Sequence, residues 1–372
     1  MDSKSIVDHF GDLSDPREDN RRHLLIDIIV LVICASICGA EKWDDIEAFG
    51  KSKESWLRRF LQLPHGIPSH DTIARVFSRL DPEALNDRFV SWVAAVNPMR
   101  EAEIINIDGK TARRSHDRGN GKPAIHMVSA WANRAGLTLA QTKVDDKSNE
   151  ITAIPELLKM LELSGCIVTI DAIGTQPSIA RDIVEADADY VLALKRNRIG
   201  LYEPVKLFFD DIEEDKRSSA LCDYSKSVNK DHGRIEIREC WATEQIDWLE
   251  AAGSYKGLRS ICAVKSQRII GEQTSTRWLY YVSSLPARAK TLAHTIRAHW
   301  GIENSLHWVL DVAFREDECR KRKDNSAENF AILRHITLNL LKSEKTCKRS
   351  IAGKRLLAGW DTSYMEKVLF NV

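Results

Sequence analysis

The sequence lacks several features that mark particular classes of protein. Its formal net charge at pH 7 is zero over 372 residues, so it lacks the basic excess of many proteins that grip phosphates. Its eight cysteines include no CxxC pair, which argues against a structural zinc site and a secreted disulfide scaffold. No internal repeat or low-complexity segment is visible. What remains is the ordinary composition of a globular protein.

The sequence also lacks the run of about 20 apolar residues that a membrane span needs. The apolar segment 24–40 contains Asp27, and we interpret it as a buried helix. The opening residues, MDSKSIVDHFGDL, do not have the pattern of a signal peptide. We therefore expect a cytoplasmic protein with reduced cysteines and no membrane contact.

Positive charge is distributed unevenly along this neutral chain. The segment 315–355 holds the run Arg320-Lys321-Arg322-Lys323 and six further lysines and arginines from 342 onward. Two readings stay open, a phosphate-binding surface and a solvated helix face.

Residues 1–98 have apolar residues at helical spacing throughout. We expect an all-helical module, with helices near 23–39, 43–62, 72–80 and 82–96. Such a module can bind DNA, and packing or dimerisation is an equal alternative.

The pattern changes to alternating strands and helices from residue 99. We predict strands at 102–110, 124–133, 137–144, 166–172 and 189–195, with helices at 150–163 and 177–186. Three strands in a meander followed by helix-linked strands indicate an α/β fold, a mixed sheet flanked by helices in the order of the RNase H-like fold. Residues 99–345 would form this domain, interrupted at 200–285 by a β-rich insertion with three strands near 234–242, 258–266 and 276–284. Helices resume near 288–309 and 326–343, and residues 346–372 are a C-terminal tail.

Two predicted strands end in an acid. Asp108 follows Ile104-Ile105-Asn106-Ile107, and Asp171 follows the β-branched run 167–170. In this strand order the first and fourth strands are neighbours, so the two carboxylates would meet and repel unless a cation lies between them. Mg²⁺ takes one or two carboxylates together with water and phosphate.

A third acid should come from a late helix. Glu303 shares a helix face with His299 and His307. Trp300 and Trp308 are expected to anchor this helix to the sheet. The rivals to Glu303 are Asp311, Glu316 and Asp317.

Several strings resemble the H-repeat-associated transposases of bacterial insertion sequences, over nearly the whole chain. They are ICGAEKWDDIEAFG (37–50), GIPSHDTIARVF (66–77), INIDGKTARRS (105–115), KSNEITAIPELL (147–158), VTIDAIGTQ (168–176), HGRIEIR (232–238) and HWGIENSLHWVLDVAFREDECR (299–320). The resemblance implies an RNase H-like DDE catalytic domain, with an Asp, Asp and Glu triad carried over to Asp108, Asp171 and Glu303. It also implies two Mg²⁺ or Mn²⁺ ions, binding to element ends and target DNA in the nucleoid, and a homodimer in the transposition complex.

The sequence departs from related insertion-sequence transposases around the Glu. Where those have Tyr, Arg and Lys at fixed spacings, this chain has His299 four residues before Glu303 and Leu310 seven after it. Arg297 and His307 are the candidates to replace the lost contacts. After the fifth strand, Lys195-Arg196-Asn197-Arg198 stands where relatives usually read Lys-Gly-Asn-Gln.

A set of cationic and polar side chains is predicted to contact DNA, with surface salt bridges as the alternative reading. The set is Lys110, Lys195, Asn197, His232, Arg234, Arg238, Arg297, His307, Arg320 and Lys321. Three rival functions remain open at this point: a metal-dependent nuclease without strand transfer, a catalytically silent relic that binds DNA, and a structural module with no role on nucleic acid.

Overall fold

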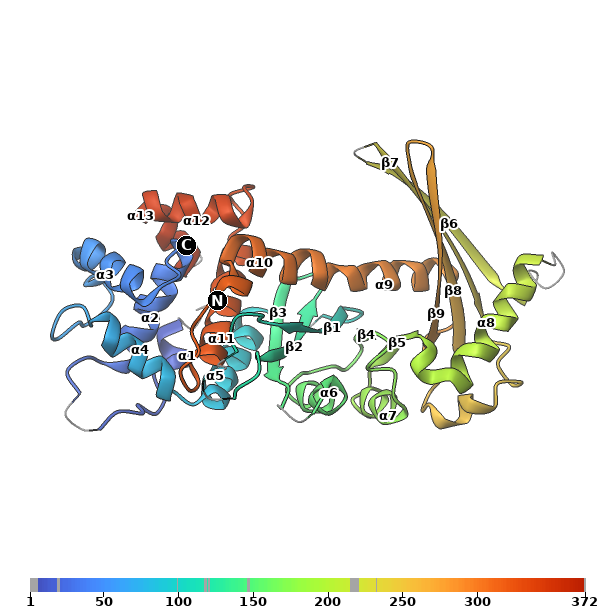
Figure 1. The fold of residues 1–372 in the computed structure, drawn as a ribbon, viewed down its shortest axis with the longest axis horizontal. Coiled ribbons are helices and arrows are strands. Elements are labelled where there is room, and N and C mark those ends of the chain that lie inside the picture. Colours follow the sequence, from blue (N-terminus) through green and yellow to red (C-terminus); the bar gives the residue numbers. More distant parts are fainter. Residues whose placement is uncertain are drawn as a thin grey trace.

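The computed structural model describes residues 6–18, 21–98, 100–116, 119, 121–145, 148–214, 221–231 and 233–370. The molecule is elongated (Figure 1). Helices from both ends of the sequence gather at one end, long β-hairpins project at the other, and helix α9 runs between the two.

The amino-terminal segment is helical, as predicted. Its helices are α1 (Ile6–Phe10), α2 (Leu25–Ile37), α3 (Trp43–Leu57), α4 (His70–Arg79) and α5 (Pro82–Val96). Helix α2 is almost fully buried, because its residues are apolar on every side. The buried Asp27 carboxylate accepts a hydrogen bond from the Leu63 backbone N–H at 2.7 Å. This confirms the interpretation of 24–40 as a buried helix, and none of the helices among the described residues has the length and apolarity to cross a membrane.

The central strands form the sheet that the sequence predicts. The strands are β1 (Ile104–Thr111), β2 (His126–Ala132), β3 (Leu137–Lys143), β4 (Ile167–Ile170) and β5 (Asp189–Leu194). Their spatial order is β3-β2-β1-β4-β5; β2 is antiparallel to β1 and β3, while β1, β4 and β5 are parallel. This is the strand order of the RNase H-like fold, and it confirms the predicted fold class.

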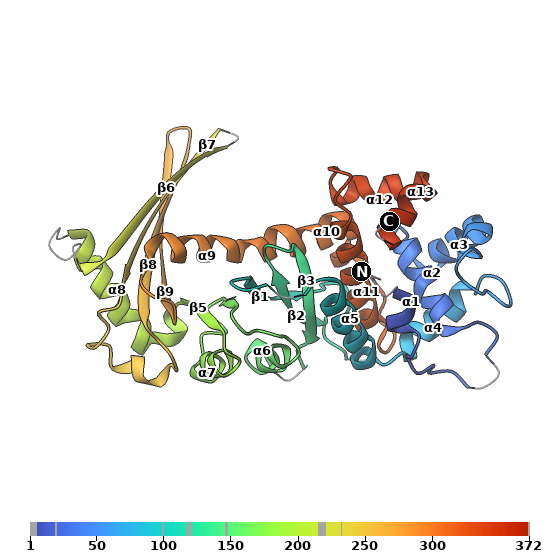
Figure 2. The same ribbon diagram turned by 180° about the vertical axis from the view of Figure 1, so that it is seen from behind.

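Helices cover both faces of this sheet. Helices α6 (Glu150–Lys159) and α7 (Pro177–Glu185) link the parallel strands on one face, and α9 (Ala289–Ile302) crosses the opposite face (Figure 1, Figure 2). The burial of the central strands on both sides explains their continuous β-branched and apolar sequences.

The insertion extends the same sheet. Helix α8 (Ile199–Glu214) leads into β6 (Asp223–Asp231), β7 (Arg234–Thr243), β8 (Ser260–Ile270) and β9 (Gln273–Ser283). Strand β9 pairs antiparallel with β5, giving nine strands in the order β3-β2-β1-β4-β5-β9-β8-β7-β6. The sequence analysis gave three strands here. It missed β6 because an exposed edge strand carries polar and lysine residues that do not alternate.

The carboxyl-terminal part is helical. After α9 the helix continues through a π-helical turn, Glu303–His307, into α10 (Trp308–Phe314), and α11 (Ser326–Ser343) follows. Helices α12 (Ile351–Trp360) and α13 (Thr362–Phe370) occupy the predicted tail, to which the sequence analysis assigned no element.

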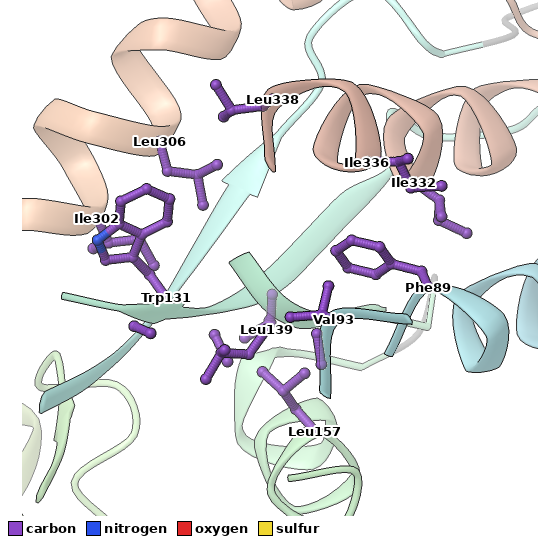
Figure 3. Packing of buried hydrophobic residues seen from close by; sticks show 14 of the residues in the cluster. Phe89, Val93, Trp131, Leu139, Leu157, Ile302, Leu306, Ile332, Ile336 and Leu338 are labelled. Carbon is purple, nitrogen blue, oxygen red and sulfur yellow. The ribbon is translucent and has the colours of Figure 1, made fainter. Parts of the chain in front are cut away.

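The carboxyl-terminal helices pack against the amino-terminal ones. Trp56 Nε1 donates to Glu366 Oε1 at 2.8 Å, and Arg355 pairs with Glu41 at 2.7 Å. One hydrophobic core connects α5, the sheet and α11, as the side chains in Figure 3 show.

The expectation that Trp300 and Trp308 anchor the helix to the sheet was wrong. Their exposed fractions are 45% and 59%, whereas Ile302 and Leu306 are buried. Trp131 of β2, in contrast, is buried in the same cluster as Ile302 and Leu306 (Figure 3). Spacing alone defines a helix face but not which face meets the sheet.

Candidate metal centre and active site

The pairing of β1 with β4 brings two aspartates to one edge of the sheet. Ile107 pairs in register with Ile170, and Asp108 and Asp171 each come one residue later. The carboxyl ends of neighbouring parallel strands meet at the same edge, so the two acids arrive at the same level. Asp171 Oδ1 accepts a hydrogen bond from the Ile173 backbone N–H at 2.9 Å.

The third predicted acid reaches this edge from the helix above it. Glu303 opens the π-helical turn, and π-turns are frequent at functional sites. His307 Nδ1 lies 3.1 Å from Glu303 Oε2 and 3.6 Å from Asp108 Oδ2. One ligand-type atom from each of Asp108, Glu303 and His307 lies within 4.8 Å of the other two, a spacing that can hold a metal ion.

All three predicted acids line one cavity of about 310 Å³. Asp108 and Asp171 come from the sheet, and Glu303 comes from the helix. Two cationic side chains, Lys195 and Arg277, also line the cavity. The cavity therefore combines carboxylates for cations with positive charge for an anionic substrate.

The electrostatics of Asp108 fit a cation at this place. Burial raises the pKa of Asp108 to about 7, and the carboxylates of Glu150, Asp171 and Glu303 contribute to the rise. A carboxylate in such surroundings is costly to ionise unless a cation neutralises it. The donor set is rich in oxygen, which suits Mg²⁺ or Mn²⁺. The residues present thus fit the divalent cations expected from the sequence.

The rivals to Glu303 are engaged elsewhere. Lys110 Nζ lies 2.7 Å from Asp311, 3.5 Å from Asp317 and 3.7 Å from Glu316. The Lys110 side chain is only 12% exposed and is held by these acids. This position gives no support to its predicted contact with DNA, and it leaves Glu303 as the helix acid that lines the cavity with the two aspartates.

A buried hydrogen-bond chain fixes the helix on the sheet. Asn106 Nδ2 donates to the Ala298 carbonyl at 2.9 Å, and Thr169 Oγ1 donates to Asn106 Oδ1 at 2.8 Å. Thr169 Oγ1 also lies 2.9 Å from His299 Nδ1. Burial lowers the pKa of His299 to about 4, so its ring is neutral at pH 7. Sequence reasoning missed Asn106 and Thr169, whose only signal is a polar residue inside each apolar strand.

A fourth carboxylate near Asp108 was also missed. Glu150, at the start of α6, lies 2.8 Å from His126 Nε2. The pair packs so closely against Gly109 that a Cβ at this position would overlap both side chains. The close packing of these two side chains therefore explains why a residue without a side chain follows Asp108, and the sequence alone did not reveal this.

Two predicted DNA contacts lie beside Asp171. The Lys195 side chain is 60% exposed, and its Nζ lies 3.9 Å from Asp171 Oδ2. Asn197 Nδ2 donates to the Ala172 carbonyl at 2.7 Å and holds the loop after β4. Lys195 is thus an exposed cation beside Asp171, while Asn197 positions the backbone.

The predicted arginines of the insertion gather against α9. Arg234 lies 2.9 Å from Glu236, and Arg238 pairs with the same carboxylate. Burial, Arg238 and Arg234 lower the pKa of Arg297. Arg234 and Arg238 share the Glu236 carboxylate and Arg297 lies near them, which leaves an excess of positive charge. His232 lies outside the described residues.

Arg238 and Arg297 line a groove of about 770 Å³ between the hairpins and α9. The groove shares Arg277, Leu279 and Trp300 with the cavity that holds the acids. A positively charged groove therefore leads directly to the carboxylates.

The predicted basic run borders a separate groove of about 1250 Å³ beside α3 and α4. Arg320 and Lys321 both line it. Lys321 Nζ lies 4.5 Å from the ring centre of Trp43 and 3.8 Å from that of Phe330, and it donates to the Glu41 carbonyl. Burial lowers the pKa of Lys321 to about 8. Lys321 thus joins the amino-terminal helices to α11, whereas Arg320 is exposed.

Two family models match this chain. The family model described as "Transposase DDE domain" matches residues 99–340, and one described as "DDE_Tnp_1-associated" matches residues 7–93. An Escherichia coli protein named "Putative transposase YncI" is 40% identical, over 99% of this chain and 95% of its own length. The Escherichia coli protein named "H repeat-associated putative transposase YhhI" is 38% identical, over 99% of this chain and 98% of its own.

Among solved structures, the chain is similar to piggyBac transposase in a cryo-EM structure of its synaptic complex with hairpin DNA. The TM-score is 0.41 at 12% identity, covering 98% of this chain and 78% of that one, a likeness too distant to support conclusions about this chain. The family resemblance seen in the sequence is confirmed by the family model and by the relatives named above. The chain belongs to the DDE transposase family.

Proposed function

We propose that this protein cleaves DNA at the ends of an insertion element and joins those ends to target DNA. The observation that carries the proposal is the single cavity lined by Asp108, Asp171 and Glu303. The raised pKa of Asp108, which reflects burial and crowding by other acids, supports a cation-binding role for this cavity.

The three acids would hold two divalent cations, Mg²⁺ or Mn²⁺. When bound, such cations activate an attacking water or 3′-hydroxyl and stabilise the departing oxygen of a phosphodiester. The chain itself supplies position and charge. Asn106 and Thr169 tie α9 to the strands, so that Glu303 is held over Asp108.

DNA would approach along the groove that shares Arg277 and Trp300 with the cavity. Lys195 would meet a phosphate next to Asp171, and Arg238 and Arg297 would meet phosphates farther along the strand. Such contacts release counterions, so binding should weaken steeply as salt rises. We also propose a homodimer, because transposition acts on two ends of one element.

The test uses purified full-length protein and duplex DNA that carries the terminal inverted repeats of its own element, with Mg²⁺ or Mn²⁺. Asp108→Asn, Asp171→Asn and Glu303→Gln should each abolish cleavage and leave DNA binding intact. Glu185→Gln is the matched control, because Glu185 is exposed and pairs with Lys256 on the surface. Cleavage that persists in any of the three variants would overturn the proposed roles of these acids.

The same assay separates the rival functions. Cleavage without joining of a 3′ end to target DNA would indicate a nuclease. Salt-sensitive binding without cleavage in either metal would indicate a silent relic; a short relative, 44% identical over 21% of this chain, is named "Inactive transposase YbfQ". Failure to bind DNA at low salt would leave a structural module.

A further inference from the structure

We propose that His307 is a ligand of the catalytic cation, through its Nδ1 atom, together with Asp108 and Glu303. This inference rests on the proposed function and specifies it further, since it gives the site a nitrogen donor. The cation it would favour is a transition metal such as Mn²⁺ in preference to Mg²⁺, because magnesium strongly prefers oxygen ligands.

The two distances from His307 Nδ1 to the acids fit the binding of one ion. His307 Nδ1 lies 3.1 Å from Glu303 Oε2 and 3.6 Å from Asp108 Oδ2, and the chosen donor of each residue lies within 4.8 Å of the others. Ligands about 2.1 Å from a metal ion stand roughly 3 to 4.2 Å apart, according to the angle between them. His307 meets this condition with both acids at once.

The ring of His307 is enclosed by the protein, whereas the side chain of its partner Glu303 is exposed at the surface. The His307 side chain is 5% exposed and that of Glu303 is 56% exposed. His307 and Leu306 are the two buried residues of the π-helical turn. A ligand fixed by packing needs no reorganisation when the ion arrives.

The far nitrogen of the ring is enclosed by the protein. In a coordinating imidazole, the ring nitrogen that does not bind the metal keeps its proton and usually donates it to a second group. His307 Nε2 is buried and has no hydrogen-bond partner among the described residues, and the same is true of His335 Nδ1. His335 lies close enough to interact electrostatically with His307. Ligation through Nδ1 would place the remaining ring proton on the buried Nε2 atom.

The competing interpretation is that His307 only donates a hydrogen bond to Glu303 and positions it. Both interpretations predict loss of activity in a His307 variant, so activity cannot decide between them. The identity of the atoms bound to the ion can.

Electron spin-echo envelope modulation of the Mn²⁺-loaded full-length protein gives that identity. We expect a ¹⁴N coupling to the bound ion, which disappears in His307→Asn and persists in His294→Asn, an exposed histidine of the same helix. Labelling the wild type with ¹⁵N-histidine should change the modulation to a ¹⁵N pattern, so the ligand is identified as a histidine even if the variant does not fold.

Each outcome bears on the inference. Bound Mn²⁺ without nitrogen coupling would overturn it and leave the proposed function standing. Coupling that survives in His307→Asn and disappears in His299→Asn would also overturn it. Mn²⁺ that fails to bind, or that binds equally well to Asp108→Asn, would overturn both the inference and the proposed site.

Affinity provides a second measurement. Calorimetric titration should show that His307→Asn weakens Mn²⁺ binding about tenfold or more, while Mg²⁺ binding changes less. Equal weakening of both ions would contradict a nitrogen ligand and favour the positioning role.

Discussion

Replacing Asp108 with asparagine should stabilise the metal-free protein, and should do so only at neutral and alkaline pH. Asp108 has a pKa of about 7 in the folded state, against 3.8 for the ordinary side chain. The folded protein therefore keeps a proton that the unfolded chain releases, and the free energy of unfolding falls as pH rises from about 4 to about 7. Below pH 4 both states are protonated, so the effect vanishes there.

The size of the effect follows from the same values. A difference of roughly 3 pH units at about 1.4 kcal/mol each gives an upper limit of about 4 kcal/mol. The Asp108 side chain is 27% exposed, so solvent screening reduces this to about 2–3 kcal/mol. Asparagine keeps the shape and cannot ionise. For a chain of this length the gain corresponds to a rise of on the order of 3 °C in Tm.

The assay is thermal or urea unfolding of the EDTA-treated wild type and Asp108→Asn at pH 4 and at pH 8. The variant should be equal to the wild type at pH 4 and more stable at pH 8, and saturating Mn²⁺ should remove its advantage. Asp210→Asn controls for the loss of a surface charge, since Asp210 pairs with Lys206 on the outer face of α8. An Asp108→Asn variant that is less stable at both pH values would refute the argument that this carboxylate is crowded.

Three further predictions test the surroundings of the acids. Gly109→Ala should break the contact between Glu150 and His126 and lower the free energy of unfolding in urea by about 1–3 kcal/mol. An unchanged unfolding midpoint would contradict the close packing of these two side chains against Gly109. Thr169→Val should lower the free energy of unfolding by about 1–3 kcal/mol, because it leaves buried Asn106 Oδ1 without its hydrogen-bond donor. A loss below roughly 0.5 kcal/mol, the usual range for surface substitutions, would show that this hydrogen bond contributes little to stability. Lys195→Ala should lower the slope of log K against log salt by about 1 in fluorescence anisotropy with DNA, and the slope of Lys256→Ala should stay at the wild-type value.

The fold could be predicted from the sequence wherever burial imposes a pattern. Strands β1, β4 and β5 are largely buried, so their apolar, β-branched runs stand out, and the strands and helices between them along the chain indicate which strands are neighbours. The two aspartates were visible because each is an acid at the end of such a run. Their meeting follows from the pairing of Ile107 with Ile170.

The rest of the site depends on contacts between distant segments. The sequence places His307 four residues from Glu303, yet only the π-helical turn and the crossing over β1 bring it to Asp108. Glu150 and His126 are 24 residues apart and meet through packing at Gly109. Lys110 illustrates the limit of reading neighbours along the sequence. Its position two residues after Asp108 suggested a contact with a phosphate, whereas in the fold its ammonium group pairs with Asp311 of α10.

The proposed site requires three carboxylates, far apart in sequence, to share divalent cations. Anomalous diffraction from crystals of the full-length protein soaked in Mn²⁺ would locate those cations. We expect manganese peaks in the cavity, within ligand distance of Asp108, Asp171 and Glu303, and none there in Asp108→Asn. Crystals with strong manganese peaks elsewhere and an empty cavity would contradict the account.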